Sequence, residues 1–494
     1  MATRDLLLGL DLGTSSLKGI FLNGNGEILA KHEIALATHR SGSHGEVAEQ
    51  NAHDYRDALV EFINVANKSH ELIGRVKAIG LSGHTPSLVP IDSNGEPTAP
   101  VMIWQDNRAS TEARALAERF GDPRKIIGTS LPWSPSTTAA KAFWLRKNSN
   151  ALVAKTRWLL QPKDYLGFLL TGAAISDPWS TKGLCNVRTQ QPLDEVIDFI
   201  GWSREVVPEL RDGFASRGVT SEKCASAFGV PAGIPVSVGW SDAMCGMLAL
   251  GVFAKPTSFI ITGTSAIVGT STASAPEHDQ PLYLIPEGAA PNPVIFGPTQ
   301  MSGGSISWAA QLFGKTENEF ISRGAANSSA QVPTYLPYIA GERAPLWRED
   351  IRGSYTNISI THDSSAFARA TMEGICFAER QVVELSQHLT KSNLDEHDEI
   401  VISGKAGNDP RWLATRLRTM GRALRVVDDV EITCRGAAIL ADVIHTQNIS
   451  ASTAALSVSG NVVHPSNADR EYGNVNYQIF LAEQEALLAK TALR

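Results

Sequence analysis

The sequence predicts an α/β protein built from two similar halves, and two observations carry this prediction. A short pattern occurs twice, about 250 residues apart, at residues 6–18 and 258–269: an apolar run, then Gly-Thr-Ser, then a second apolar run. Such runs on either side of a tight turn are typical of two strands joined by a hairpin. In each half a helical pattern and a further strand then follow, which is the order expected of an α/β domain.

In the first half, strands are expected at residues 6–11, 17–23 and 27–36, with Asn23-Gly-Asn-Gly26 as the hairpin turn between the last two. The next segment, 53–67, is predicted to be a helix because its apolar positions recur at helical spacing. These positions are Tyr55, Leu59, Phe62, Ile63 and Ala66. A strand at 76–81 follows and ends at Ser82-Gly83.

The second half repeats this order, with strands at 257–262 and 266–271, a long helix at 364–388, a strand at 399–403 and a helix at 410–421. Between the halves, residues 236–242 are predicted to form a strand that ends in a carboxylate, Asp242, and leads into a helix over 243–250. We therefore expect two domains, 1–247 and 248–494.

The amino-acid composition disfavours several classes of function. A chain of 494 residues with 43% hydrophobic content can bury large cores. The net charge of −7 and the pI of about 6.0 give no bulk electrostatic signal for nucleic acid or an anionic membrane, so neither partner is expected. No segment approaches 18 uninterrupted apolar residues, and no leader pattern precedes the first strand. The five scattered cysteines form no C-x-x-C pair, which favours a reducing, cytoplasmic location.

The two Gly-Thr-Ser turns predict phosphate binding. Glycine lets a ligand approach the backbone closely, and hydroxyls lie beside it. Two such cradles suit the two ends of a polyphosphate, and Asp11, before the first turn, is a candidate Mg²⁺ ligand. The alternative is an ordinary hairpin with a turn aspartate, which the second copy of the pattern disfavours. We therefore predict a two-domain enzyme that uses ATP in a cleft between its domains.

Asp242 has two interpretations. An aspartate after a strand and before a helix often caps that helix. The same position suits a general base that removes a proton from a substrate hydroxyl during phosphoryl transfer. The two roles are compatible.

Two polar segments are candidates for binding a polyol. Trp104-Gln-Asp-Asn-Arg108 follows an apolar strand, and Gln161-Pro-Lys-Asp-Tyr165 has the same character. An aromatic ring can stack on the carbon face of a sugar while the polar groups bind its hydroxyls. The alternative for each is a loop of surface polar residues. Gly314-Lys-Thr316 is not a P-loop, because the Walker pattern would need glycine where Ala309 stands. Zinc, hydrolase and dinucleotide motifs are not found.

With these residues assembled, the chain resembles the FGGY carbohydrate kinases of the actin-like ATPase superfamily, and within them the xylulokinase branch. The matching stretches extend over nearly the whole chain. They are Gly9-Leu-Asp-Leu-Gly-Thr-Ser-Ser16, Trp104-Gln-Asp-Asn-Arg108, Pro162-Lys-Asp-Tyr-Leu166, Gly239-Trp-Ser-Asp242, Thr262-Gly-Thr-Ser265, Tyr338-Ile-Ala-Gly-Glu-Arg-Ala-Pro345 and Gly436-Ala-Ala-Ile-Leu440.

The resemblance implies two ribonuclease-H-like domains flanking a deep catalytic cleft. It also implies an ATP- and Mg²⁺-dependent kinase of a small ketose, a ketopentose such as xylulose or ribulose, and a homodimer as a family expectation. Asp242 would be the base, and Asp11 and Asp242 would hold Mg²⁺. The expected sugar contacts are Thr85, Trp104, Asp106 and Asp242; the expected ATP contacts are Thr14, Ser15, Lys18, Gly263, Thr264, Gly304, Gly404 and Lys405.

Two departures from the family pattern matter. Xylulokinases carry Gly-Gln-Met-His-Gly where this chain has Gly83-His-Thr-Pro-Ser87, so Thr85 and Pro86 replace two sugar contacts. We therefore expect that D-xylulose is not the uniquely best substrate. The adenosine motif Gly-Gly-Gly-Ala is here Ser403-Gly-Lys-Ala406, where Lys405 would crowd the nucleotide or pair with its phosphates. Alternatives are a kinase of another polyol, such as a tetrulose or glycerol, and a non-catalytic actin-like nucleotide switch.

Overall fold

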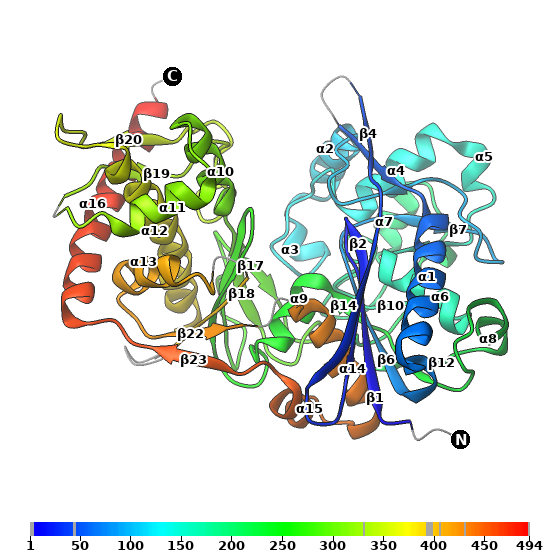
Figure 1. The fold of residues 1–494 in the computed structure, drawn as a ribbon. Helices are drawn as coiled ribbons and strands as arrows, with labels where there is room; N and C mark the ends of the chain where they lie inside the picture. The colour runs from blue at the N-terminus through cyan, green and yellow to red at the C-terminus, as the bar shows by residue number, and fades with distance from the viewer. Residues whose placement is uncertain are drawn as a thin grey trace. The chain divides into compact units, whose positions relative to one another are not determined.

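The computed structural model describes residues 4–42, 46–329, 331–391, 399–404, 407–428 and 431–492. The chain forms two compact units (Figure 1). Unit 1 contains Met1–Ala254, Ile285–Pro291 and Glu431–Ser457; unit 2 contains Lys255–Leu284, Asn292–Val430 and Val458–Arg494. The predicted two-domain α/β fold is therefore present, but a single boundary at 247/248 does not describe the packing, because residues 431–457 pack within unit 1.

Unit 1 is centred on a seven-stranded sheet in the order β12-β13-β6-β1-β2-β3, with the short strand β14 also pairing with β6. The strands are β1 (Leu6–Leu12), β2 (Ser16–Leu22), β3 (Ile28–Ala35), β6 (Val76–Gly83), β12 (Ser216–Val219), β13 (Pro235–Ser237) and β14 (Trp240–Ser241). β1 pairs antiparallel with β2 and parallel with β6. The three strands predicted first, and the fourth at 76–81, all lie in this sheet.

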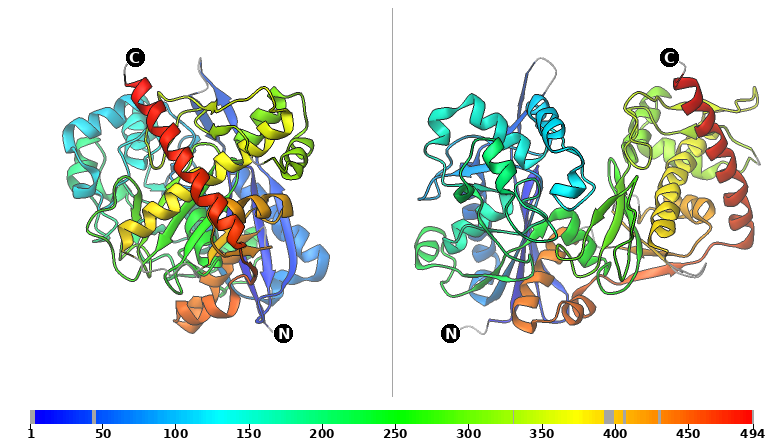
Figure 2. Two further views of the ribbon diagram at one scale, coloured as in Figure 1. Left: turned by 90° about the vertical axis from the view of Figure 1, so that its left-hand side faces the viewer. Right: turned by 180° about the vertical axis from the view of Figure 1, so that it is seen from behind.

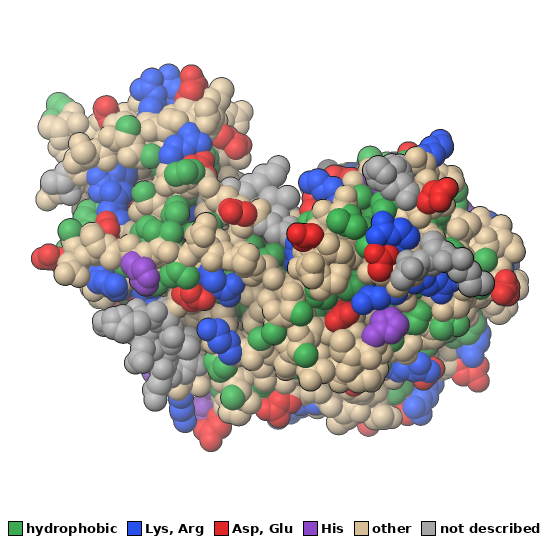
Figure 3. All heavy atoms as spheres, turned by 60° about the horizontal axis from the view of Figure 1, so that its bottom comes forward, with side chains coloured by type: hydrophobic (Ala, Val, Ile, Leu, Met, Phe, Trp, Pro, Cys, Tyr) green, Lys and Arg blue, Asp and Glu red, His purple; other side chains and the backbone are tan. Residues whose placement is uncertain are grey.

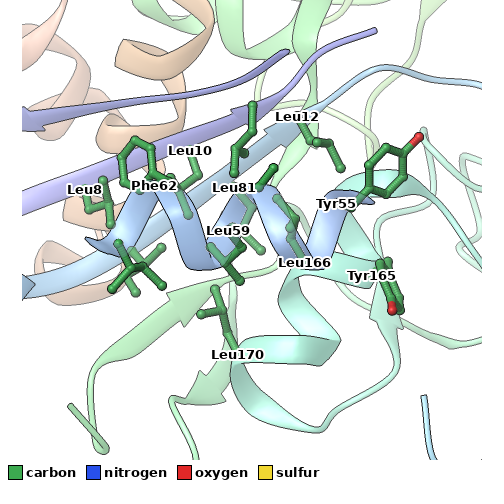
Figure 4. Close-up of a cluster of buried hydrophobic side chains, with 14 of the residues drawn as sticks. Leu8, Leu10, Leu12, Tyr55, Leu59, Phe62, Leu81, Tyr165, Leu166 and Leu170 are labelled. Atoms are coloured by element: carbon green, nitrogen blue, oxygen red, sulfur yellow. The ribbon is translucent and has the colours of Figure 1, made fainter. Parts of the chain in front are cut away.

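Both faces of β1 are buried, and the two faces meet different neighbours. Leu8, Leu10 and Leu12 lie in the hydrophobic core with Leu59 and Phe62 of α1 (Ala52–His70), which Figure 4 shows in close-up. The helix α6 (Pro162–Thr171) adds Tyr165, Leu166 and Leu170 to the same core. The predicted helix at 53–67 is thus confirmed, with the predicted apolar face turned to the sheet.

On the opposite face, α14 (Ile432–Thr446) lies against glycines rather than side chains. A Cβ added at Gly80 would lie 1.6 Å from the carbonyl oxygen of Ala437, and one at Gly9 would lie 1.9 Å from that of Cys434. Contact at backbone distance on both strands explains why this late segment of the chain belongs to unit 1. A Cβ at Gly436 would in turn meet the carbonyl oxygen of Cys245 at 1.9 Å, which places α14 equally close to α9 (Asp242–Ala249).

One predicted strand is interrupted. Residues 236–242 were expected to be continuous, but β13 ends at Ser237 and β14 begins at Trp240. Gly239 has φ of 87°, a backbone conformation that glycine adopts without strain and that an extended strand excludes. A Cβ there would also lie 2.4 Å from the carbonyl oxygen of Leu81. After this break the chain resumes as β14, which pairs with the last residues of β6.

The remaining elements of unit 1 surround the sheet. The helices are α2 (Ser110–Phe120), α3 (Pro123–Ile126), α4 (Thr138–Asn148), α5 (Asn150–Val153), α7 (Asp194–Phe199), α8 (Glu222–Phe228) and α15 (Ile449–Leu456), with 3-10 turns η1 (Leu72–Arg75) and η2 (Arg204–Val206). Small sheets pair β4 (His39–Ser41), β5 (Val47–Gln50) and β8 (Val101–Met102), β7 (Val89–Ile91) with β9 (Trp158–Leu160), and β10 (Ile175–Ser176) with β11 (Glu209–Leu210).

Unit 2 contains a second seven-stranded sheet, in the order β17-β18-β16-β15-β21-β22-β23. Its strands are β15 (Ser258–Thr262), β16 (Ala266–Ser271), β17 (Tyr283–Ile285), β18 (Val294–Pro298), β21 (Ile400–Ser403), β22 (Leu424–Val427) and β23 (Gly460–Val463). The β15–β16 hairpin pairs antiparallel and β15 pairs parallel with β21, which repeats the arrangement of β1, β2 and β6. The repeat predicted from the sequence is therefore present in the structure as a repeat of strand order and strand direction.

The helices of unit 2 are α10 (Gly303–Leu312), α11 (Glu317–Ala326), α12 (Ser364–Thr390), α13 (Pro410–Met420) and α16 (Asn467–Thr491), and a small sheet pairs β19 (Thr334–Leu336) with β20 (Ser354–Thr356). The long helix predicted at 364–388 is α12. The last helix, α16, lies against α12 (Figure 2). Phe377 of α12 and Tyr477 and Phe480 of α16 lie in one buried cluster. None of the helices described here has the length and apolar content needed to cross a bilayer.

The α14 contact gives a direct test of the unit 1 packing. We expect Gly80→Ala to destabilise the protein by about 1–3 kcal/mol or more, because the added methyl group must displace backbone atoms of α14 rather than a flexible side chain. Gly74→Ala is the control, since a Cβ at Gly74 meets nothing within 4 Å. Urea unfolding of the two variants measures the difference, and equal midpoints would contradict the packing described.

Candidate active site

Asp11 lies near the end of β1, where its carboxylate is held from two sides. Its Oδ1 accepts a hydrogen bond from the Ser82 hydroxyl at 2.7 Å, and its Oδ2 accepts one from the Thr433 hydroxyl at 2.9 Å. The residue is only 6% exposed, and this burial raises the pKa of the Asp11 carboxyl. Ser82 comes from the neighbouring strand β6 and Thr433 from α14, so the fold itself fixes the direction of this carboxylate.

Asp242 is the first residue of α9 and follows β14 directly. The helix N-cap is Ser241, whose hydroxyl accepts from the amide of Met244, so the capping interpretation of Asp242 is wrong. The shorter serine side chain, one residue earlier, occupies the capping position and leaves the carboxylate of Asp242 for other uses. That carboxylate accepts a hydrogen bond from the amide of Ala243 at 2.7 Å.

The two carboxylates interact. β6 pairs with β1 on one side and with β14 on the other, with Asp11 opposite Ser82 and Ser241 opposite Gly83. Asp11, in β1, and Asp242, directly after β14, therefore lie at the same end of the two strands that flank β6. Burial, followed by the charge of Asp11, raises the pKa of Asp242 to about 7, while the Lys182 ammonium opposes this shift. A carboxyl that changes charge near neutral pH suits a proton acceptor or a cation ligand.

The first Gly-Thr-Ser turn is anchored to the rest of unit 1. The Trp104 indole donates a hydrogen bond to the Thr14 hydroxyl at 3.1 Å, and the Gln50 amide donates to the Thr14 carbonyl at 2.6 Å. Ser15 is exposed at the tip of the turn. Lys18, opposite Asp11 in the β1–β2 register, has its ammonium 3.8 Å from carboxylates of both Glu33 and Glu431.

The two predicted sugar contacts in the Trp104–Arg108 segment have different surroundings. Trp104 is 41% exposed and open to a ligand. Asp106 has no exposed surface; its carboxylate accepts from the Arg108 guanidinium and from the amide of Ala48. Arg108 also pairs with Glu49 at 2.7 Å. In this structure Asp106 orients Arg108 and the strand β5 and presents no free oxygen surface to a ligand, which does not support its predicted direct contact with sugar.

The loop at residues 83–87, which departs from the xylulokinase pattern, is held by hydrogen bonds on both sides of Thr85, and Thr85 itself is half-buried. His84 Nδ1 lies 2.9 Å from the Ser87 hydroxyl, and the Ser87 amide donates to the side chain of Gln161 at 2.8 Å. The fully buried Lys141 donates to the carbonyl of Pro86 at 2.8 Å. Burial lowers the pKa of Lys141 to about 7 and that of His84 to about 3.

Sequence reasoning missed a set of buried lysines in unit 1. Lys141 was not proposed for any role, and Lys163 appeared only within a motif. Lys163 has no exposed surface, and its ammonium lies 2.5 Å from Asp164 and 2.9 Å from Asp177. A third lysine, Lys182, is 8% exposed and interacts electrostatically with Asp242. The sequence signal that could have revealed them is a single lysine inside an otherwise apolar helical run, as in Thr138–Trp144. Such a lysine is buried together with the run, and a buried charge needs a partner.

In unit 2 the second Gly-Thr-Ser turn lies against the start of α10. The amides of Ser302 and Gly304 both donate to the carbonyl of Thr264, at 2.8 Å and 3.0 Å, and the amide of Gly303 donates to that of Gly263 at 3.0 Å. These contacts bring three predicted nucleotide-binding residues, Gly263, Thr264 and Gly304, into one backbone-rich corner.

The fourth, Gly404, lies at the end of β21 with φ of 99°. A Cβ there would meet the carbonyl oxygen of Thr262 at 2.3 Å. The hydroxyl of Thr262 donates to the carbonyl of Ser403 at 2.9 Å, which joins the two strand ends. Gly404 is therefore required by the close contact between the ends of β15 and β21. Lys405 lies outside the described residues.

The surface and the metal-ligand groups add two observations. On the face drawn in Figure 3, the basic and acidic side chains of the described residues are interspersed. Among those residues, no cluster of three or more His, Cys, Asp or Glu side chains forms a ready metal site. A cation held by Asp11 and Asp242 would therefore complete its ligands from phosphate oxygens and water, as Mg²⁺ commonly does.

Comparison with known proteins identifies the family. Residues 6–249 match the N-terminal domain of the FGGY family of carbohydrate kinases, and residues 258–444 match its C-terminal domain. The chain belongs to this family. It is a carbohydrate kinase with the actin-like ATPase fold, and the resemblance predicted from short motifs is confirmed.

Curated relatives of this FGGY kinase carry more than one sugar name. The xylulose kinase of Bacillus subtilis is 27% identical over 455 residues, covering 88% of this chain and 87% of that protein. The gluconokinase of Bacillus subtilis is 23% identical over 450 residues, with coverage of 88% and 86%. In fold, a Brucella ovis protein described as a xyloylose kinase superimposes with a TM-score of 0.88 at 23% identity, covering 98% and 99% of the two chains.

The raised pKa of Asp242 predicts a stability change in the absence of ligand and metal. The folded protein holds this proton more tightly than the unfolded chain, whose carboxyl has a pKa near 3.8. The ionised carboxylate therefore destabilises the fold fully above about pH 7, and this effect fades as the pH falls toward 4. We expect Asp242→Asn to raise Tm in EDTA at pH 8 and to leave it nearly unchanged at pH 4.5. Asp198→Asn, on the exposed side of α7, is the control; a pH-independent difference for Asp242→Asn would contradict the assignment.

Proposed function

We propose that this FGGY kinase transfers the γ-phosphoryl group of ATP to a hydroxyl of a small ketose, a ketopentose such as xylulose or ribulose. The observation that carries the proposal is the pair of interacting carboxylates, Asp11 and Asp242, at the same end of the two strands that flank β6 in unit 1. The names of the relatives, most of them xylulose kinases, support a ketopentose. The alternative of a non-catalytic nucleotide switch is set aside, because the family is one of kinases.

Asp242 is the proposed general base. The acceptor hydroxyl oxygen attacks the γ-phosphorus, the bond between that phosphorus and the β–γ bridging oxygen breaks, and the hydroxyl proton passes to the Asp242 carboxylate. The products are a sugar phosphate and ADP. A base with a pKa near the working pH combines a useful ionised fraction with a good driving force for proton uptake. Its hydrogen bond to the Ala243 amide keeps the carboxylate oriented.

Asp11 is the proposed Mg²⁺ ligand, together with Asp242. The fit rests on hard oxygen donors whose direction is fixed: both Asp11 oxygens are already oriented by hydroxyl donors. When bound, Mg²⁺ would neutralise charge on the phosphate oxygens. Thr14 and Ser15, beside Asp11, are proposed to donate to the transferred phosphoryl group. Lys18 is proposed to act there as a nearby positive charge, with Glu33 and Glu431 as its present partners.

Gly263, Thr264, Gly304 and Gly404 of unit 2 are proposed to bind the phosphates and the nucleoside of ATP. The support is the sequence motif together with the position of Gly263, Thr264 and Gly304 where the second Gly-Thr-Ser turn meets the start of α10. Lys405 is proposed for the same ligand on the sequence motif alone.

Sugar recognition is proposed for Thr85, for Trp104 and for Asp242, which would bind the reacting hydroxyl. Asp106 is proposed to act indirectly, by positioning Arg108. Because Thr85 and Pro86 stand where xylulokinases carry Met and His, we expect another ketopentose or a related polyol to match or exceed D-xylulose in kcat/KM. A coupled ADP-release assay over ketopentoses, ketotetroses and polyols tests both statements. Turnover of polyols without any ketose would contradict the proposal, and a hundredfold preference for D-xylulose over all others would contradict the specificity.

Replacing the base should remove turnover. We expect Asp242→Asn to lower kcat by about 10²–10⁴-fold, because the proton then has no positioned acceptor. Asp198→Asn serves again as the matched control. A residual kcat above roughly a tenth of the wild-type value would remove Asp242 from this role.

Replacing the proposed metal ligand should have a different signature. We expect Asp11→Ala to raise the Mg²⁺ concentration needed for half-maximal activity while changing the KM for sugar little, since Mg²⁺ would keep its phosphate and water ligands. Magnesium titration of activity at saturating ATP measures the shift. An unchanged titration midpoint with lowered kcat would show that Asp11 acts in some other way.

A further inference from the structure

Ser302 connects the second Gly-Thr-Ser turn to the helices of unit 2. Its amide donates to the carbonyl of Thr264 at 2.8 Å, and its hydroxyl donates to Oε1 of Glu379, in α12, at 3.1 Å. Ser302 is the N-cap residue of α10, where a serine hydroxyl usually accepts from an amide of the first helical turn. Here the hydroxyl makes no such bond to the described helix and binds the carboxylate instead. The orientation of Ser302 is therefore set by Glu379.

Glu379 is held in one orientation by a buried arginine. Glu379 has no exposed surface, and Arg416, in α13, is 1% exposed. Arg416 Nε lies 3.2 Å from Oε2 of Glu379, and Arg416 Nη2 lies 3.2 Å from Oε1. Two N–H donors that bind both oxygens fix the rotation of a carboxylate as well as its place. The guanidinium also lies over the Trp412 ring, 4.9 Å from the ring centroid. The oxygen that accepts from Ser302 thus has a defined position.

A second buried carboxylate holds the other end of the same short segment. Glu342 is 3% exposed, and its Oε1 accepts from the amide of Gln300 at 2.6 Å and from that of Arg343 at 2.8 Å. Residues 300–302 are therefore attached at both ends to buried glutamates that come from different parts of the chain.

This segment determines where the predicted nucleotide-binding residues lie. Directly after it, the amide of Gly303 donates to the carbonyl of Gly263 and the amide of Gly304 donates to that of Thr264, both at 3.0 Å. The contact is close, because a Cβ added at Gly303 would lie 2.8 Å from the carbonyl oxygen of Gly263. A shift of Ser302 must therefore also move the turn or the first residues of α10.

We propose that Glu379 is a positioning residue for nucleotide binding. Held by Arg416, it fixes Ser302, and Ser302 fixes the corner that the second Gly-Thr-Ser turn forms with the start of α10. The inference rests on the proposed function, because it assumes that this corner binds ATP. It deepens that function by assigning part of the nucleotide affinity to a buried ion pair between α12 and α13 that acts through Ser302.

The energetics of a buried ion pair favour this role over a purely stabilising one. Withdrawing two charges from water costs about as much as their attraction returns, so apolar residues of similar volume often give an equally or more stable protein. An apolar pair between α12 and α13 would supply no acceptor for the Ser302 hydroxyl. That hydroxyl would then be buried without a partner or would turn to cap α10. The ion pair provides a fixed oxygen at this position, which apolar side chains cannot do.

The experiment separates positioning from stability with four variants. Ser302→Ala removes the hydrogen bond and leaves the ion pair intact, and Ser302→Thr restores the hydroxyl. The double variant Glu379→Leu/Arg416→Met replaces the ion pair by apolar side chains. Ser386→Ala is the control, because it removes another fully buried serine hydroxyl of unit 2, one that donates to the carbonyl of Val383 in α12. For each, calorimetric titration gives the Kd of ADP in the presence of Mg²⁺, and KM for ATP, KM for the best acceptor and Tm are measured.

We expect Ser302→Ala and the double variant each to raise the Kd of ADP and the KM for ATP by about 3–30-fold, the size typical of residues that act on a site without touching its ligand. KM for the acceptor should stay at the wild-type value, and Ser302→Thr should recover most of the affinity. The double variant should keep or raise Tm, because the ion pair is replaced as a whole. Adding Ser302→Ala to it should lower the affinity no further, since both changes remove the same hydrogen bond. Ser386→Ala should lower Tm and leave the Kd of ADP unchanged.

Three results would overturn the inference. The first is an unchanged Kd of ADP in both Ser302→Ala and the double variant. The second is a combined variant whose loss of affinity is the sum of the two separate losses. The third is a loss of affinity that follows Tm across all variants, Ser386→Ala included, because that pattern marks a general effect of stability. If the double variant does not fold, as its Tm would reveal, the comparison of Ser302→Ala with Ser302→Thr decides.

A fifth variant, Gly263→Val, tests the assumption about the corner itself. A Cβ at Gly263 meets only the carbonyl oxygen of Ser265, at 3.2 Å, so the added side chain extends mainly into open space beside the turn. If Gly263→Val weakens ADP binding and the Ser302 variants do not, the inference alone fails. If Gly263→Val binds ADP as the wild type does, the corner is not the nucleotide site, and the proposed ATP contacts fail together with the inference.

Discussion

The arrangement of unit 1 depends on one buried carboxylate and the hydrogen bonds that it requires. Asp11 is almost fully withdrawn from water, and a carboxylate in that position needs donors from the protein. One donor, Ser82, comes from the neighbouring strand; the other, Thr433, comes from a helix 422 residues later in the chain. The helix approaches closely enough to supply it only because Gly9 and Gly80 leave the sheet surface bare. A functional group and a packing requirement are therefore satisfied by the same contact.

The electrostatics of the site follow from the same geometry. Burial of Asp242 and, after it, repulsion between the Asp242 and Asp11 carboxylates raise the pKa of Asp242 to about 7. A bound cation or a nearby ammonium would relieve it. The free protein is thus less stable than it could be at neutral pH, which is a common property of sites that bind charged ligands. The Lys182 ammonium opposes part of this rise in pKa.

Much of this structure could be predicted from the sequence because its signals are local. The hairpins around Gly13 and Gly263 carry strong strand patterns, and the helical spacing of Tyr55, Leu59 and Phe62 is visible without any tertiary contact. Several of the misses involve partners distant in sequence. Asp106 looked like a ligand-facing acid because the sequence does not show that the amide of Ala48, 58 residues away, joins Arg108 in occupying its carboxylate. The buried Lys141 donates to the carbonyl of Pro86, 55 residues away, and the break at Gly239 depends on the carbonyl of Leu81.

The discontinuity of unit 1 has a consequence for how the protein is made. Chains emerge from the ribosome at about 5–20 residues per second, and early domains usually begin to fold before later ones exist. Here the glycine-lined face of β1 and β6 has no cover until residues 431–457 have been synthesised. For most of translation the first unit is an incomplete sheet with one apolar face exposed. Its final closure must wait until almost the whole chain has been released, so a fragment ending before α14 would lack the Thr433 hydroxyl bond to Asp11 and the cover over that face.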